Sequence, residues 1–211
     1  MKRFYSKNEF IFSRCKNMNV LDLGCIEHDL FHERILKKEW LHMNIKKVAK
    51  SLIGIDILKE YITELNEKGF NIVFGNVEKL DEVTELDKKI FDVIIAGDLI
   101  EHLFNQGKFL DSIRLFCDKN TEVIITTPNC FSTKFMIPYF FYGKEKVRED
   151  HTCWFSMNTL EQLLELNGFM VKESYFRSDI RINGIRPFFR VTFRKIFPRI
   201  CEGLIVVAKI K

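Results

Sequence analysis

Short, continuously apolar runs alternate with longer amphipathic stretches along this chain of 211 residues. An apolar run without alternating polar positions is typical of a strand that is covered on both faces of a parallel sheet. Seven such runs predict strands at residues 19–24, 52–57, 71–76, 91–98, 122–128, 169–176 and 202–210. Helical stretches separate the first five strands, so these strands are expected to be parallel. The prediction is a Rossmann-like, doubly wound α/β sheet with helices on both faces and an antiparallel last strand.

Three helical stretches have an apolar face and recognisable ends. Residues 57–69 stop at Gly69, as a helix with a glycine C-cap does. Residues 98–117 and 156–169 follow the same pattern, and Ser156 is placed to cap the latter. Residues 31–51 predict one extra helix, which carries Trp40 and His42 and is expected to pack on the sheet rather than to cap a ligand.

Composition adds few constraints. A hydrophobic fraction of 46% and a charged fraction of 29% suit one globular domain over residues 1–211. The formal charge of +4 is too small to indicate nucleic acid. The six cysteines have no regular spacing, so we expect reduced thiols without a metal site or a disulfide framework. No signal peptide or membrane span is predicted, and the expected location is the cytoplasm.

Polar residues follow five successive strands at the edge where ligands bind in such sheets. They are Asp22, Gly24 and Cys25, then Asp56, then Asn76, then Gly97 and Asp98, and finally Thr127 and Asn129. Gly24 lets a ligand approach the backbone, Asp56 is placed to accept from a ribose diol, and Asn76 can read an adenine amino group. A single aspartate at a strand end is more commonly a helix cap. The occurrence of polar residues at five successive strand ends, however, indicates one ligand cleft.

The ordered segments "VLDLGC", "GIDI", "FGNVEKL", "FDVIIAGDLIEHL" and "TPN" resemble the motifs of class I S-adenosylmethionine-dependent methyltransferases. The segment "DHTCWFSMNTLEQLLELNGF" is similar to one found in the small-molecule and glycan-modifying branches. The resemblance covers roughly residues 18–178 and implies S-adenosylmethionine as cofactor. The cofactor-binding residues that it implies are Asp22, Gly24, Cys25, Asp56, Ile57, Asn76, Val77, Gly97 and Asp98.

Two departures from the family pattern concern the cofactor site. Ile26, Glu27 and His28 stand where the family continues with Gly-x-Gly, and Asn76 replaces an aspartate. A loop with one glycine suits a nucleoside ligand better than a dinucleotide, whose pyrophosphate needs a second glycine. A nicotinamide-dependent oxidoreductase therefore ranks last. The missing glycines leave open a non-catalytic methyltransferase-like domain that acts in binding or scaffolding.

Methyl transfer needs mainly alignment, and a general base only for a hydroxyl or a protonated amine. The candidate catalytic residues are His151, Asp98 and His102, with Glu101 close by. His102 also suits a packed helical face, and His151, in a predicted loop, also suits a capping or surface position. The expected acceptor is a small molecule, a sugar or a lipid-linked glycan.

Two appended segments bear on the acceptor. Residues 130–155 contain an apolar stretch and predict an acceptor-side lid. Residues 181–200 interleave phenylalanines with cations, and the cations between 181 and 199 are accompanied by no acid. This basic aromatic segment is either a helix packed on the domain or, over residues 186–199, a contact with an anionic membrane or a lipid-linked acceptor.

Overall fold

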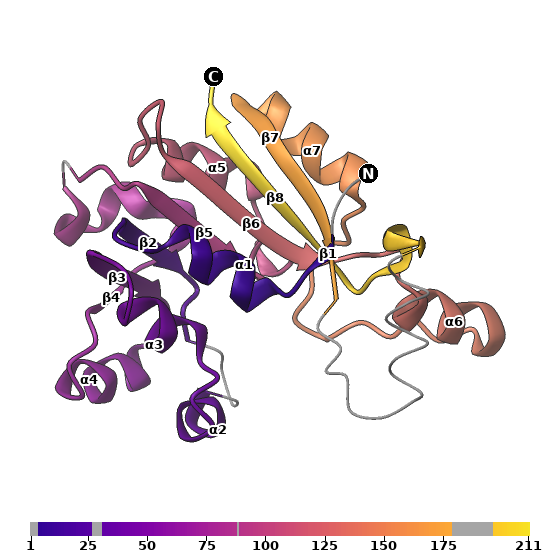
Figure 1. The fold of residues 1–211 in the computed structure, drawn as a ribbon, viewed down its shortest axis with the longest axis horizontal. Helices are drawn as coiled ribbons and strands as arrows, with labels where there is room; N and C mark the ends of the chain where they lie inside the picture. The colour runs from indigo at the N-terminus through magenta and orange to yellow at the C-terminus, as the bar shows by residue number, and fades with distance from the viewer. Residues whose placement is uncertain (1–3, 27–30, 88, 179–195) are drawn as a thin grey trace.

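The computed structural model describes residues 4–26, 31–87, 89–178 and 196–211, and these form one twisted mixed sheet with helices on both faces (Figure 1). The strand order is β1-β7-β8-β6-β5-β2-β3-β4. The strands are β1 (Phe4–Tyr5), β2 (Asn19–Leu23), β3 (Ser51–Asp56), β4 (Ile72–Phe74), β5 (Val93–Gly97), β6 (Glu122–Pro128), β7 (Phe169–Arg177) and β8 (Gly203–Ile210). Strand β8 is antiparallel to both β6 and β7, and the other pairs are parallel. The predicted fold class is confirmed.

The described part of the sheet has one strand more than the sequence predicted. Strand β1 pairs Phe4 with Phe176 and Tyr5 with Arg177 at the outer edge of β7. Two residues are too few for hydrophobic periodicity to reveal a strand.

Seven α-helices and four short 3₁₀ helices are described. The α-helices are α1 (Lys7–Arg14), α2 (Phe31–Leu36), α3 (Leu41–Lys46), α4 (Lys59–Glu67), α5 (Gln106–Arg114), α6 (Thr133–Tyr142) and α7 (Met157–Leu166). The 3₁₀ helices are η2 (Val77–Glu82), η3 (Thr84–Leu86), η4 (Ile100–His102) and η5 (Pro198–Ile200). Figure 1 shows α6 standing apart from the sheet, beyond the end of β6.

Side chains of successive residues in the central strands point to opposite faces and enter two separate cores. Ile94 and Ala96 of β5 belong to the core that α5 and α7 cover. Val93 and Ile95 belong to the core that α1 and α3 cover. Both faces of the sheet are therefore covered by helices, which explains why the sequences of these strands are continuously apolar.

Two predicted helices are broken in the structure. The stretch 98–117 divides into η4 and α5, because Asn105 starts a new helix by accepting from Lys108 N at 2.9 Å. The stretch 31–51 divides into α2 and α3, and Trp40 precedes the second of these. Of the predicted segment 181–200, residues 181–195 lie outside the described residues, and η5 accounts for most of the remainder.

The middle of the sheet accommodates a tightly packed imidazole. Gly54 of β3 lies beside Asp22 of β2, and the His42 ring packs against its bare backbone. A Cβ at position 54 would lie 2.6 Å from Cys25 Sγ and 2.8 Å from His42 Cε1. Because real Cβ atoms do not approach so closely, α3 and the loop after β2 can reach β3 only over a glycine.

We expect Gly54→Ala to destabilise the protein by about 1–3 kcal/mol, because the added methyl group overpacks His42 and Cys25. Urea denaturation followed by circular dichroism measures this change. Gly107→Ala in α5 is the matched control, since its Cβ would meet only ordinary contacts at 3.6 Å. Equal urea midpoints for Gly54→Ala and the wild type would contradict the close packing.

Candidate active site

The carboxyl ends of β2, β3, β4 and β5 bring the predicted cofactor residues to one edge of the sheet. Asp22 is 4% exposed, and its Oδ2 lies 2.8 Å from His42 Nδ1. Both side chains are buried, so removing either partner would leave the other polar group without compensation. The main contact of Asp22 in this structure thus holds α3 against β2.

Asp56 connects the loop after β2 to the start of α4. Its Oδ2 accepts from Ile26 N at 2.8 Å, and its Oδ1 accepts from Leu58 N at 3.1 Å. The residue is 5% exposed. Asp56 thus fixes the loop after β2 at the place where the sequence predicts a ribose-binding carboxylate.

The loop after β2 has one glycine in a conformation that requires it. Gly24 has φ +65°, its N–H donates to Ile55 O at 2.8 Å, and a Cβ there would lie 2.8 Å from Leu99 Cδ1. The next turn is fixed by a side chain, because Trp40 Nε1 donates to Cys25 O at 2.7 Å. Burial raises the pKa of the Cys25 thiol well above its usual value, so Cys25 packs as an inert residue. Glu27 and His28 lie outside the described residues.

The residues predicted at the adenine side have different environments. Asn76 is exposed, and its side chain accepts from Glu78 N at 2.9 Å as the cap of η2. Val77 is buried in the core. The Ile57 side chain is 61% exposed directly after Asp56, where an apolar group can pack on a nucleobase.

Asp98 is held by two cations from distant parts of the chain. Its Oδ2 accepts from Lys7 Nζ at 2.9 Å, and its Oδ1 accepts from Arg177 at 2.5 Å and from Thr126 Oγ1 at 3.0 Å. Although burial opposes its charge, the Arg177 and Lys7 charges hold the pKa of Asp98 well below its usual value. Asp98 is therefore ionised but a weak base, which argues against a proton-accepting role.

Arg177 reaches Asp98 because a glycine makes room for it. A Cβ at Gly203 would lie 2.1 Å from Arg177 Nε. Neither Lys7 nor Arg177 was among the predicted site residues. Their separation from Asp98 by 91 and 79 positions left no local signal in the sequence.

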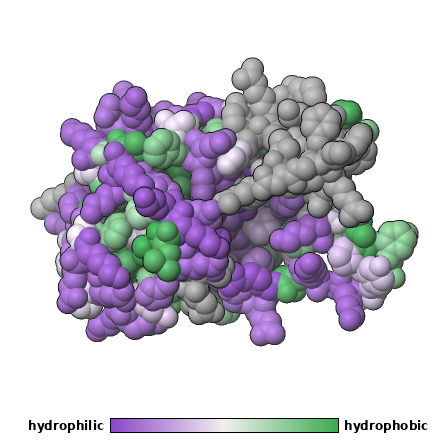
Figure 2. Space-filling model, turned by 60° about the horizontal axis from the view of Figure 1, so that its bottom comes forward, coloured by the Kyte–Doolittle hydropathy of each residue, from purple (hydrophilic) through white to green (hydrophobic). Residues whose placement is uncertain are grey.

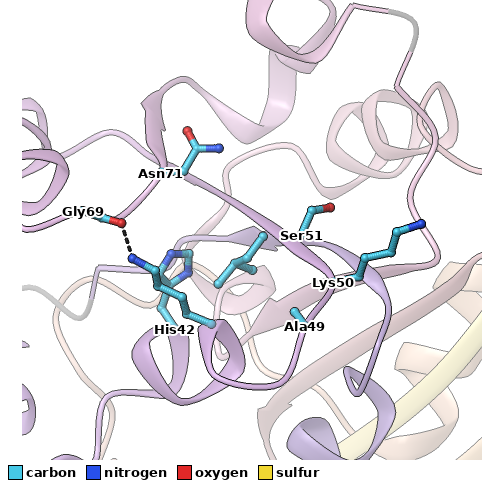
Figure 3. A pocket seen from close by; sticks show the side chains of 8 residues that line it. His42, Ala49, Lys50, Ser51, Gly69 and Asn71 are labelled. Atoms are coloured by element: carbon cyan, nitrogen blue, oxygen red, sulfur yellow. Dashed lines mark hydrogen bonds between the residues drawn. The ribbon is translucent and has the colours of Figure 1, made fainter.

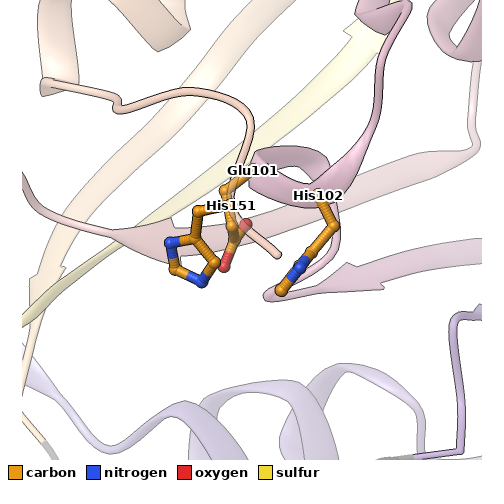
Figure 4. A group of neighbouring side chains, drawn as sticks. All are labelled: Glu101, His102 and His151. Carbon is orange, nitrogen blue, oxygen red and sulfur yellow. The ribbon is translucent and has the colours of Figure 1, made fainter. Parts of the chain in front are cut away.

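The third group at this edge is a cluster of Glu101, His102 and His151, whose side chains point toward one another in Figure 4. A carboxylate oxygen and two imidazole nitrogens all lie within 4.8 Å of one another. The two rings are 4.6 Å apart between centroids, and His102 Nδ1 lies 3.3 Å from Asp150 Oδ2. His102 therefore faces His151 from the 3₁₀ helix η4, half-buried.

Two atoms of this cluster are buried without a hydrogen-bond partner among the residues described. They are Glu101 Oε2 and His151 Nδ1. Burial, followed by the negative charge of Asp98, raises the pKa of Glu101 to about 8. Burial, followed by the charge of His102, lowers the pKa of His151. A raised carboxyl pKa beside a neutral imidazole is typical of a site that handles protons.

Two imidazoles and one carboxylate are also a ligand set for a divalent transition-metal ion. Sequence reasoning named Glu101 only as one of several candidate bases near the cleft, where it directly precedes His102 in "LIEHL". Its near-complete burial, at 2% exposure, is what makes the carboxyl unusual, and burial of a charged residue is not readable from local sequence.

Two cavities in the described part of the chain lie away from this edge. One of about 230 Å³ opens at the amino end of β3, between His42, Lys46, Lys50, Ser51 and Asn71 (Figure 3). Another of about 380 Å³ lies at the amino ends of β5 and β6. We locate the site at the carboxyl ends nevertheless, because ligands bind outside the carboxyl ends of the strands in open α/β sheets, and the predicted site residues converge there.

A protein-family model described as a methyltransferase domain matches residues 4–174. The chain belongs to this family of class I S-adenosylmethionine-dependent methyltransferases. The family and the cofactor that the sequence predicted are thus confirmed.

A curated relative is the human mitochondrial ubiquinone biosynthesis O-methyltransferase. It is 27% identical over 168 residues, which cover 74% of this chain and 42% of the relative. The chain therefore spans less than half the length of that protein.

Solved structures show the same fold. A methyltransferase from Archaeoglobus fulgidus is 20% identical with a TM-score of 0.59, covering 96% of this chain and 94% of that chain. Magnesium protoporphyrin IX methyltransferase from Synechocystis, solved with bound S-adenosylhomocysteine (SAH), is 11% identical with a TM-score of 0.60. The match covers 96% of this chain and 81% of that chain.

The structure fits the family's cofactor at two points. Gly97 has open space, since a Cβ there would have no neighbour closer than 4.0 Å. Gly24, whose φ of +65° favours glycine, turns the backbone at the carboxyl end of β2, where the methionine part of the cofactor is expected.

We expect the stability of the wild type to fall as pH rises from 5 to 8. The unfolded Glu101 carboxyl loses its proton near its ordinary value of 4.5, whereas the folded one holds it up to about 8. Between these values the native state binds more protons than the unfolded state, so each unit of pH weakens folding. Glu101→Gln removes this contribution and flattens the profile.

Urea midpoints between pH 5 and pH 8 measure the effect. Glu165→Gln, on the exposed face of α7, is the matched control and keeps the wild-type slope. A Glu101→Gln profile parallel to that of the wild type would show that the carboxyl is not held protonated.

Proposed function

We propose that this protein transfers a methyl group from S-adenosylmethionine to a hydroxyl group of a small-molecule acceptor. The observation that carries the proposal is the pair of buried, unpartnered atoms Glu101 Oε2 and His151 Nδ1 beside Asp98. Buried polar atoms normally have a hydrogen-bond partner, and the hydroxyl group of an acceptor can donate to either of these two atoms.

In this reaction the acceptor oxygen bonds to the methyl carbon, the bond from that carbon to sulfur breaks, and the hydroxyl proton must leave. Bound S-adenosylmethionine supplies the methyl group. His151 is the proton acceptor, because its lowered pKa keeps the imidazole neutral near pH 7. Asp98 stays ionised between Lys7 and Arg177, and its negative charge favours a protonated imidazole nearby.

One named relative supports an oxygen acceptor. The human relative is an O-methyltransferase of ubiquinone biosynthesis. A phenolic hydroxyl, with a pKa near 10, loses its proton to an imidazole more readily than a sugar hydroxyl does. We therefore place phenol-like acceptors first and retain sugars and lipid-linked glycans as the second class.

A non-catalytic domain remains the second candidate because of Asp56. Both of its oxygens already accept backbone N–H bonds, and the residue is 5% exposed. A ribose would have to share an acceptor that the loop uses. Binding of SAH without any methyl transfer would favour this alternative.

Methyl transfer from labelled S-adenosylmethionine to a catechol and to a simple sugar tests the proposal. We expect transfer to the catechol, and His151→Ala should lower kcat roughly 10²–10⁴-fold without changing SAH affinity. His32→Ala, an exposed histidine on α2, is the matched control. Unchanged kcat in His151→Ala would contradict the assignment of the base. A His151→Ala variant that no longer binds SAH would show that the residue belongs to the cofactor site.

A further inference from the structure

Helix α6 is apolar but buries none of its side chains. Its exposed large side chains range from 43% to 79% exposure and include Met136, Ile137, Tyr139, Phe140, Phe141 and Tyr142. Phe131 before the helix is 59% exposed. Figure 2 shows apolar side chains at the edge of the molecule where α6 lies.

The exposed residues surround the helix axis rather than forming one stripe. At about 100° per residue, the six exposed positions from Met136 to Tyr142 are spread around the axis, and within that stretch the widest gap contains only the half-buried Pro138. A groove on a protein partner, or a second copy of this chain, would cover only one side of such a helix. A bilayer can receive the apolar side chains of a helix that lies in the plane of its interface, at the boundary between headgroups and acyl chains.

The length and flanking residues of α6 suit shallow insertion. Ten residues span about 15 Å, which is half of a hydrocarbon core. No described helix is long and apolar enough to cross a membrane. Tyr139 and Tyr142 are the kind of aromatic residue that is enriched at the bilayer interface.

Charges around the helix complement anionic lipid. Between residues 131 and 148 the cations are Lys134, Lys144, Lys146 and Arg148, and the single acid, Glu145, accepts from Trp154 Nε1 at 2.7 Å. Two acids follow, Glu149 and Asp150, and Asp150 is paired with Arg148 at 3.1 Å, which leaves the lysines as the cations free of that pair. Arg199 lies near the base of α6, because its carbonyl accepts from Asn129 at 2.9 Å, four residues before the helix begins.

We propose that α6 inserts into the interface of an anionic membrane and docks the enzyme there. The helix is connected to the active-site cluster through aromatic rings, since Phe135 lies 4.7 Å and His151 lies 6.2 Å from Trp154 between centroids. Docking by α6 holds the acceptor side of the cleft toward the bilayer. This inference does not depend on which hydroxyl is methylated.

Flotation of the full chain with vesicles tests the docking. We expect binding to mixed phosphatidylcholine–phosphatidylglycerol vesicles and weaker binding to phosphatidylcholine alone. Phe140→Ser/Phe141→Ser should lower the partition coefficient roughly 100-fold, about tenfold for each phenylalanine. Leu166→Ser, which removes a side chain that is 78% exposed at the end of α7, is the matched control and should bind as the wild type does.

Circular dichroism verifies that each variant is folded, and sedimentation measures its oligomeric state. Equal vesicle binding by the double variant and the wild type would overturn the proposal. A wild-type protein that does not bind vesicles would also overturn it. If the wild type is then a dimer and the double variant is a monomer, α6 forms a contact between two copies of the chain. Equal binding to neutral and anionic vesicles would overturn the role of the charges.

Discussion

The buried carboxylate of Asp56 is the contact on which the cofactor edge of this protein depends. One of its oxygens accepts from Ile26 N, in the loop after β2, and the other accepts from Leu58 N, before α4. From the other side, Trp40 Nε1 donates to the Cys25 carbonyl of the same loop. A loop that has lost two of the family's glycines is thus shaped by an aspartate and an indole, which supply the constraint by hydrogen bonds.

The acceptor edge has a different electrostatic organisation. Asp98 keeps its charge because Arg177 and Lys7 surround it. Glu101, close by in space, holds a proton because its burial and the negative charge of Asp98 outweigh the charge of Arg177. Two acids three positions apart therefore have opposite protonation states near neutral pH. The protein accepts a stability cost at Glu101, and such costs are concentrated at functional sites.

The sequence predicted the seven longer strands because β2, β5 and β6 are buried on both faces and read as unbroken apolar runs. It also predicted the order of the cofactor residues, since the carboxyl ends of parallel strands converge in any such sheet. It did not predict the helix break before α5, because Leu103 continues the apolar pattern across it. Nor did it predict the pairs Asp22–His42 and Asp98–Arg177, since contacts between distant residues leave no local period.

The central claim is that the glycine-poor loop still forms a cofactor site because side chains hold it. Calorimetric titration of SAH into the wild type and into Trp40→Phe tests this claim most directly. We expect one site in the wild type and an affinity about tenfold lower in Trp40→Phe, since the Cys25 carbonyl loses its buried donor. Trp154→Phe, which removes the other indole of the chain, should bind SAH as the wild type does. A folded wild type that binds no SAH, or a Trp40→Phe variant with unchanged affinity, would contradict the account.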